Sequence, residues 1–213
     1  MSKKLLSMIM ILSAVLQVHS VVAQDLSANI GWSSEYLYRG IPQKTSSAFG
    51  GLDFEAAGFG LGVWAADVGD GIEIDYYGGY GYEVGDFSFS IGGTWYTYTG
   101  GFDDEYLELN LGAGWSWLSL DIAIGRYDNF DGPTLDYRFY SLTASHKGLY
   151  ATVGTFMQDF EGSYYEAGYG NTLQVKDKDL FDYSLALIYS DSTLLGGESD
   201  INLALTLSKT FSF

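Results

Sequence analysis

The chain has 213 residues with 28 glycines, two prolines and no cysteine, and its formal net charge is −17. This acidity excludes a nucleic-acid-binding protein, because phosphate contacts need clustered Lys and Arg. The lack of cysteine excludes a disulfide framework. A hydrophobic content of 47% and an aromatic content of 17% exclude a disordered chain, which would be poor in both.

The first 23 residues have the features of a secretory signal peptide. Lys3 and Lys4 precede the apolar stretch Leu5–Val18, and Val21-Val22-Ala23 comes at the expected cleavage position. The apolar stretch is too short for a comfortable membrane-spanning helix. We therefore expect an exported protein with one domain at residues 24–213. Without Lys3 and Lys4 it has eight basic and 27 acidic residues, a charge of −19.

Alternation with a period of two residues runs through the rest of the chain and predicts β-strands with one apolar and one polar face. In the segment 201–213, INLALTLSKTFSF, isoleucine, leucine and phenylalanine alternate with polar or small residues. Strand ends read in this way are uncertain by about 2–4 residues. Twelve such runs are predicted, at about residues 26–39, 46–57, 59–67, 72–83, 86–98, 105–114, 118–127, 136–146, 149–158, 164–173, 180–190 and 200–213.

The connections between these runs alternate in length. Tight turns such as Ala57-Gly58 and Val84-Gly85 follow even-numbered strands, and longer loops such as Gly40–Thr45, Asp128–Leu135 and Asp191–Ser199 follow odd-numbered ones. This alternation is typical of outer-membrane barrels. The sequence therefore predicts an all-β fold, a single antiparallel up-and-down transmembrane β-barrel. We expect about 12 strands, with 10 as the alternative, short periplasmic turns and longer outer loops.

The alternative fold is a soluble β-sandwich or lipocalin-like barrel. Aromatic girdles near the strand ends favour a membrane barrel instead, and we predict lipid-facing aromatic side chains at Trp32, Tyr36, Tyr38, Tyr80, Tyr82, Trp95, Trp115, Tyr137, Tyr183 and Tyr189. The terminal Phe213 resembles the assembly signal of bacterial outer-membrane proteins. The expected location is the bacterial outer membrane, and the expected partners are outer-membrane lipid, lipopolysaccharide, the outer-membrane assembly machinery and small solutes or ions.

The stretch EYLYRGIPQ, residues 35–43, ends an aromatic strand with a cation and a turn. If Tyr36 and Tyr38 face lipid, then Arg39 faces the lumen, where Gly40 and Pro42 end the strand. Arg39 is then either a salt-bridge partner that fixes strand register or a selectivity element. The same alternation predicts a lumen lined by the charged residues Glu35, Arg39, Asp53, Glu55, Glu73, Asp75, Glu108, Asp121, Arg138, Glu166 and Asp182.

At these residues the sequence resembles a known family. SSEYLYRGIPQ is similar to the Ser-Asp-Tyr-x-x-Arg-Gly-x-Ser-Gln signature of the TorF family of porin-like proteins, also called Gcw_chp. Residues 50–98 resemble the family's next segment, including the runs GFGLGVWA and EIDYYGGY. The likeness covers about residues 26–100, and Glu35 and Pro42 replace the family's usual Asp and Ser. The resemblance implies an outer-membrane barrel of porin type and brings no catalytic residues.

Catalysis and metal binding have little support in the sequence. Beyond the leader the one histidine, His146, has Ser145 beside it but on the opposite face of its strand, so no nucleophile and base are paired. The acidic runs that contain Asp67 and Asp131 do not have calcium-loop spacing and are typical of solvated loops, with loose divalent bridging to lipopolysaccharide as the alternative. We expect no enzyme, no cofactor and no resident metal.

Two functions remain open. The first is a passive channel for small hydrophilic solutes, whose acidic lumen prefers cations. The second is a closed barrel that serves envelope structure or surface contact. The second is favoured by Tyr77, Tyr96, Tyr98 and Tyr106, which point inward by alternation and would fill a lumen of about 12 strands.

Overall fold

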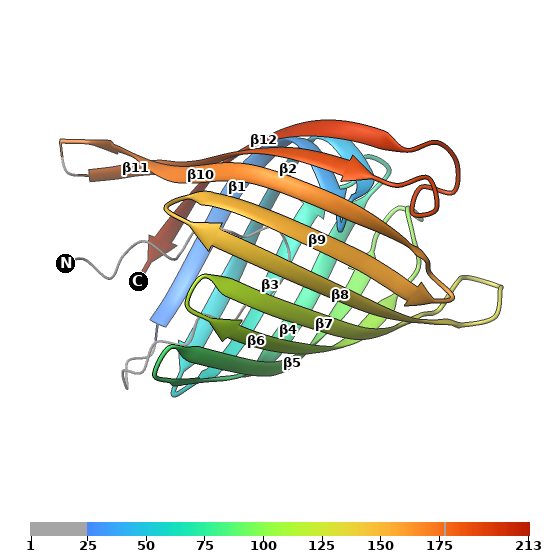
Figure 1. The fold of residues 1–213 in the computed structure, drawn as a ribbon, viewed down its shortest axis with the longest axis horizontal. Helices are drawn as coiled ribbons and strands as arrows, with labels where there is room; N and C mark the ends of the chain where they lie inside the picture. Colours follow the sequence, from blue (N-terminus) through green and yellow to red (C-terminus); the bar gives the residue numbers. More distant parts are fainter. Residues whose placement is uncertain (1–24, 177) are drawn as a thin grey trace.

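A computed structural model of the chain describes residues 25–176 and 178–213, and the predicted signal peptide lies outside these residues. The described residues form one closed antiparallel barrel in which each strand pairs with its neighbours in sequence and β1 pairs with β12 (Figure 1). No helix long and apolar enough to cross a bilayer occurs in the described part of the chain. The predicted all-β up-and-down barrel is therefore confirmed, with 12 strands rather than 10.

The predicted strands agree with the observed ones, most within about two residues. The strands are β1 (Asp25–Tyr38), β2 (Ile41–Ala56), β3 (Phe59–Asp67), β4 (Ile72–Val84), β5 (Phe87–Tyr98), β6 (Tyr106–Trp115), β7 (Leu118–Tyr127), β8 (Leu135–His146), β9 (Leu149–Gln158), β10 (Gly162–Val175), β11 (Lys178–Ser190) and β12 (Asp200–Ser212).

The two ends of the barrel differ in their connections. At one end, which we call the tight-turn end, the even-numbered strands up to β8 return through two-residue turns such as Ala57-Gly58 and Lys147-Gly148, whose residues have positive φ. At the other, the long-loop end, the connections at residues 68–71, 99–105, 128–134, 159–161 and 191–199 gather together (Figure 1). The β10–β11 hairpin projects beyond the other strands at the tight-turn end (Figure 1).

The β1–β2 connection departs from the prediction. A loop was expected at Gly40–Thr45, but the chain turns at Arg39-Gly40 and β2 begins at Ile41. Pro42 lies within β2, opposite Leu37 and beside a register shift in the pairing of the two strands. Proline has no backbone N–H to donate, and it is tolerated there because the irregular pairing does not require a ladder hydrogen bond from this residue. This connection sits at the long-loop end but is the shortest one there.

Alternation divides every strand between an apolar outer surface and an inner one. Leu61 and Ile201 are 63% exposed on the outside. Inside, the barrel has two halves of different character. The long-loop half carries large inward side chains, among them Tyr36, Tyr96, Tyr127, Tyr137, Phe139, Phe156 and Tyr164. The tight-turn half carries mainly glycine, serine and threonine inward, at Gly51, Gly79, Gly81, Ser88, Ser90, Gly112, Gly114, Ser119, Thr143, Thr152, Gly168, Thr172 and Ser184.

Candidate functional site: a constriction in the lumen

The β1–β2 hairpin bends into the barrel at its end, which we call the hairpin tip (residues 37–41). Arg39 and Gly40 have φ values of 49° and 82°, as in two-residue turns between twisted strands. The Ser190 hydroxyl on β11 donates a 2.6 Å hydrogen bond to the Gly40 carbonyl oxygen. A Cβ on residue 40 would lie 2.5 Å from the Tyr164 Cβ on β10. Glycine therefore lets the hairpin tip pack against β10 and β11, which are three and two strands from β1 around the barrel.

Arg39 extends from the hairpin tip across the lumen to β6. Its Nη1 and Nη2 atoms donate to the two carboxylate oxygens of Glu108 at 2.6 and 2.9 Å. The side chains of Arg39 and Glu108 are 9% and 0% exposed. The guanidinium carbon also lies 4.2 Å from the ring centre of Phe139 and 4.8 Å from that of Tyr38, within the range of a cation–π contact. The ion pair thus links the two sides of the barrel.

Glu108 accepts further hydrogen bonds from donors on four strands. The hydroxyls of Tyr38, Tyr96 and Tyr137 donate to it at 3.2, 3.1 and 2.7 Å, and the side-chain amide of Asn110 donates at 2.9 Å. A buried ion pair is stable when additional hydrogen bonds satisfy the remaining lone pairs. With the guanidinium included, every oxygen of Glu108 is satisfied. This carboxylate is therefore the centre of the constriction.

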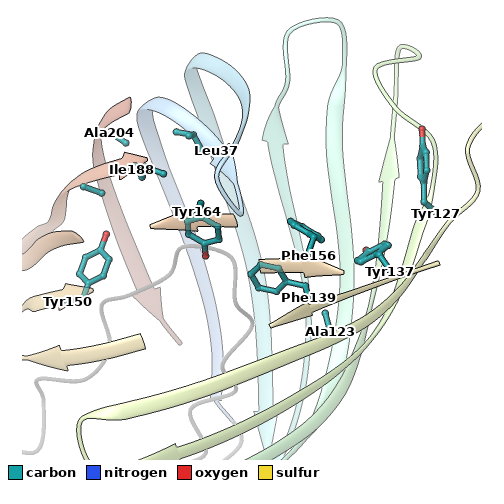
Figure 2. Close-up of a cluster of buried hydrophobic side chains, with 11 residues drawn as sticks. Leu37, Ala123, Tyr127, Tyr137, Phe139, Tyr150, Phe156, Tyr164, Ile188 and Ala204 are labelled. Atoms are coloured by element: carbon teal, nitrogen blue, oxygen red, sulfur yellow. The ribbon is translucent and has the colours of Figure 1, made fainter. Parts of the chain in front are cut away.

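Aromatic side chains fill the space around this ion pair. Tyr137 stacks on Phe160 with ring centres 4.9 Å apart, and Tyr106 stacks on Tyr127 at 4.3 Å. Figure 2 shows Tyr164, Phe139 and Phe156 below Leu37 of the hairpin tip, with Tyr137 beside them. The buried members of the cluster are Leu37, Ala123, Tyr127, Tyr137, Phe139, Tyr150, Phe156, Tyr164, Ala186, Ile188 and Ala204. Apart from Tyr150, which lies beside the Lys147-Gly148 turn, these side chains pack the long-loop half of the lumen.

A second group of buried carboxylates lies on β4. Glu73 is 1% exposed and accepts a 2.5 Å hydrogen bond from the hydroxyl of Tyr36. Tyr36 packs edge to face against Trp64, with ring centres 5.8 Å apart. Asp75 is 2% exposed, and its Oδ1 has no hydrogen-bond partner among the described residues. Glu73 is therefore hydrogen-bonded within the constriction, whereas one carboxylate oxygen of Asp75 is not.

Other predicted lumen acids lie toward the tight-turn end. Asp53 on β2 accepts hydrogen bonds from Tyr77 on β4 and, at 3.4 Å, from Asn29 on β1. Asp182 on β11 accepts a 2.7 Å hydrogen bond from Thr172 on β10. These carboxylates are each tied to a neighbouring strand. Their side chains lie along the wall of the tight-turn half and do not extend across the lumen.

The remaining predicted acids also lie on the inner surface of the barrel. Glu166 on β10 is 7% exposed and accepts a 2.5 Å hydrogen bond from Tyr150 on β9. Asp121 on β7 lies in register with Ser141 on β8, on the same face as the buried Ala123. Glu55 lies two residues from Asp53 on β2 and shares its face. The structure therefore brings the predicted acids, apart from Glu35, to the inner surface.

Two predicted lumen charges do not lie with this group. Arg138 is exposed on the outer surface of β8, between the buried residues Tyr137 and Phe139. Its placement in the lumen was wrong because Tyr137 was expected to face lipid, whereas the apolar residues of β8 point inward here to pack around Arg39. Glu35 lies in an exposed position where Thr45 donates to it at 3.0 Å, away from the buried carboxylates.

The predicted lipid-facing positions of Tyr36 and Tyr38 are also wrong. Both rings point inward, to Glu73 and to Glu108. Alternation already breaks between Ser33 and Tyr36, which are both buried, near Ser46 of β2, whose φ is positive. The pairing of β1 with β2 then shifts register between Tyr36 and Leu37, as at a β-bulge. Arg39 nevertheless reaches the lumen, through the turn rather than through strand alternation.

The other predicted girdle residues remain outside the barrel. Trp32 is 36% exposed, Tyr82 55% and Tyr189 39%, and the outer face also carries Tyr80, Trp95, Trp115 and Tyr183. Inside, the four tyrosines expected to point inward do so: Tyr96 is 4% exposed, and Tyr77, Tyr98 and Tyr106 contact the acids and rings of the lumen.

The structure also places the residues considered for catalysis and metal binding. His146 is exposed at the end of β8, and the Ser145 backbone N–H donates to the Trp117 carbonyl. Asp67 accepts from Lys44 and from the Gly69 backbone N–H. In the described ranges, no group of three or more His, Cys, Asp or Glu side chains is arranged to hold a metal ion.

Comparison with known proteins gives one family. A family described as "bacterial protein of unknown function (Gcw_chp)" matches residues 19–137, more than half of the chain. No curated protein matches this chain. The name TorF does not appear in these matches, so that part of the resemblance stays a prediction.

Solved structures are similar to this chain at low sequence identity. One from a study of how membrane proteins crystallise in meso has a TM-score of 0.57 and 10% identity, over 89% of this chain and 84% of that one. OccK1 (OpdK) of Pseudomonas aeruginosa has a TM-score of 0.42 and 16% identity, over 89% of this chain and 61% of its own. OprD of the same species has 0.41 and 14%, over 92% and 68%. The chain thus spans less than two thirds of OccK1.

Proposed function

The chain belongs to the Gcw_chp family, and from this membership and the closed barrel we propose that it is an outer-membrane channel. In this proposal small hydrophilic solutes pass without energy input through a lumen that the hairpin tip narrows. The channel prefers cations and carries out no catalysis. The observation that carries the proposal is the Arg39–Glu108 ion pair, a polar contact placed across the lumen rather than along its wall.

Placement in the outer membrane is supported by the outer surface. Large apolar side chains are exposed on every strand, including Ile30 at 59%, Leu61 at 63% and Leu203 at 58%. Soluble monomers rarely expose apolar patches of more than a few hundred Å², whereas lipid-facing barrel walls are built in this way. Residues 1–23 would direct export. Recovery of the protein in the soluble periplasmic fraction would contradict this placement.

The strand end at Phe213 is proposed to act in assembly. Its backbone N–H donates a 2.9 Å hydrogen bond to the Leu26 carbonyl oxygen of β1, and its side chain is 77% exposed. The ring is therefore available to the assembly machinery rather than packed in the barrel. Deleting Phe213 should lower the amount of membrane-inserted barrel, measured by its gel mobility before and after boiling. Normal membrane levels would show that the ring is incidental.

Cation preference follows from the charges inside the barrel. The inner surface carries one arginine, Arg39, and its charge is already matched by Glu108. Asp53, Glu55, Asp75, Asp121, Glu166 and Asp182 remain as further acids on the same surface. A cleft with low-dielectric walls and charges of one sign concentrates counter-ions. An open pathway past the hairpin tip should therefore admit cations more readily than anions.

Recording from the purified protein in a planar bilayer tests the proposal. We expect single-channel currents, and under a salt gradient a reversal potential whose sign shows cation preference. A gel shift on boiling serves as the control that the reconstituted barrel is folded. Folded protein that gives no current at any voltage would contradict a channel.

That negative result would favour a closed barrel with a structural or surface-contact role. A specific observation supports this second function, since the aromatic cluster packs the lumen around the hairpin tip. The two functions differ in whether the hairpin tip moves. In a channel it must leave the lumen at least transiently, whereas in a closed barrel it is a permanent part of the core.

A further inference from the structure

Asp75 has an unusual position among the buried acids. Its Oδ1 is the one buried side-chain nitrogen or oxygen in residues 25–176 and 178–213 that lacks a hydrogen-bond partner. Neighbouring Glu108 and Glu73, by contrast, accept hydrogen bonds from tyrosines. A buried polar group without a partner costs free energy, and an unpaired buried charge costs more. The structure therefore contains a buried acceptor that lacks its donor.

No ion pair joins this carboxyl group to a lysine or arginine among the described residues. Asp75 is within electrostatic range of Arg39, Glu73 and Glu108, but both guanidinium Nη atoms of Arg39 are already bonded to Glu108. Lys44 is paired with an acid of β3. Arg39, bonded to Glu108, thus lies among three acidic side chains, and the other two, Glu73 and Asp75, are not in an ion pair with it.

The surroundings of Asp75 indicate which donor is missing. Tyr36, Tyr77 and Tyr96 lie within electrostatic range of it, and Tyr96 is its partner in register on β5. A carboxylate beside tyrosine rings suits an ammonium group, which donates to the carboxylate and is attracted to aromatic faces. A metal ion would need several oxygen ligands, and the described residues provide no group of three acids or histidines.

We propose that Asp75 is the binding site for the primary ammonium group of a small organic cation that passes through the lumen. The inference rests on the proposed channel function and names its class of solute. Asp75 is 2% exposed, so the solute reaches it only when the side chains that cover it rearrange. Tyr36, which leads into the hairpin tip and donates to Glu73, interacts electrostatically with Asp75. In this proposal, binding at Asp75 therefore requires a rearrangement of the constriction.

Equilibrium binding to the folded barrel in detergent tests the site without requiring conduction. The probe is n-butylammonium chloride, with neutral n-butanol and potassium chloride as controls at equal ionic strength, measured by calorimetry. We expect saturable binding of butylammonium alone. Asp75→Asn should weaken it by at least about tenfold, the size of one charge-assisted hydrogen bond. The matched control Asp182→Asn, at a lumen acid that already has a donor, should lower the affinity by less than about twofold, because it removes only a more distant charge that salt screens.

Several results would overturn the site. They are no saturable binding by the wild-type barrel, equal binding of butanol or potassium, or equal loss in Asp75→Asn and Asp182→Asn. The wild-type comparison of butylammonium with butanol decides the matter even if Asp75→Asn does not fold. Saturable, Asp75-dependent binding by a barrel that shows no current would refute the channel and leave the site standing. Current without butylammonium binding would refute the site and leave the channel standing.

Discussion

The same β-strands line both halves of the lumen, but the inward side chains of the two halves differ. In the long-loop half the inward residues are large, and they close around a buried ion pair from the hairpin tip to β6. In the tight-turn half the inward residues are mostly glycine, serine and threonine, and the acids there are tied to adjacent strands. A barrel of this strand number has limited internal width, so side-chain size decides which half is blocked.

This difference between the halves indicates which residues determine ion selectivity and which determine the stability of the barrel. Acids of the tight-turn half such as Asp182 have one hydrogen bond from a neighbouring strand, and changing them should affect ions more than folding. Glu108 in the long-loop half joins groups from β1, β5, β6 and β8. The constriction is therefore also the tertiary core of the barrel, and the two roles can be separated by variants in each half.

The largest effect is expected from Glu108→Gln. It leaves the buried Arg39 guanidinium without its carboxylate, and removing one partner of a buried pair destabilises a protein by roughly 3–5 kcal/mol. Urea unfolding, followed by the gel shift on boiling, measures the loss. Asp182→Asn is the matched control in the tight-turn half and should cost under about 1 kcal/mol. Equal losses in the two variants would show that the halves do not differ as described.

A smaller effect is expected from inward glycines under aromatic rings. A Cβ on Gly125 would lie 2.1 Å from the Tyr137 ring, whereas a Cβ on Gly112 would meet the Ser90 hydroxyl at 2.4 Å. Gly125→Ala should displace Tyr137 from Glu108 and destabilise the barrel by about 1–3 kcal/mol. Gly112→Ala should have little effect, because a serine hydroxyl can rotate away. The same urea titration compares them, and the reverse order would contradict the close packing of the long-loop half.

The smallest effect is expected from Asp121→Asn. This change removes one lumen carboxylate of several, so the ratio of cation to anion permeability should fall by less than about twofold. The fall should be greater at low salt, because screening shortens the reach of the remaining charges at high salt. Reversal potentials under salt gradients at two ionic strengths measure it. An effect that grows with ionic strength would contradict an electrostatic origin.

Most of the fold could be predicted from the sequence. Alternation locates β3, β7 and β9 to the residue, because each has a strict two-residue period between clear turns. The β1–β2 connection could not be predicted, since Gly40 and Pro42 resemble the start of a loop. The chain in fact turns in two residues there, and this depends on contacts with Tyr164 and Ser190 that no local pattern reveals.

The site was predicted less completely. Alternation placed Asp53, Glu73 and Glu108 on the inner face, but it could not tell which acid Arg39 would meet, because that pairing joins residues 69 positions apart. Tyrosine was ambiguous as well, since its ring and hydroxyl suit both a lipid interface and a polar lumen. Tyr137 and Phe139 share one face of β8, but the sequence does not show whether that face points to lipid or to the lumen.

The central claim is that the hairpin tip narrows the lumen through its ion pair. The double variant Arg39→Ala with Glu108→Gln tests it most directly, because it removes both charges and leaves no unpaired buried ion. Single-channel conductance in a planar bilayer is compared with that of the wild type, with the gel shift as the folding control. The account predicts a clearly larger conductance in the double variant. A folded double variant with unchanged conductance, or with none, would contradict it.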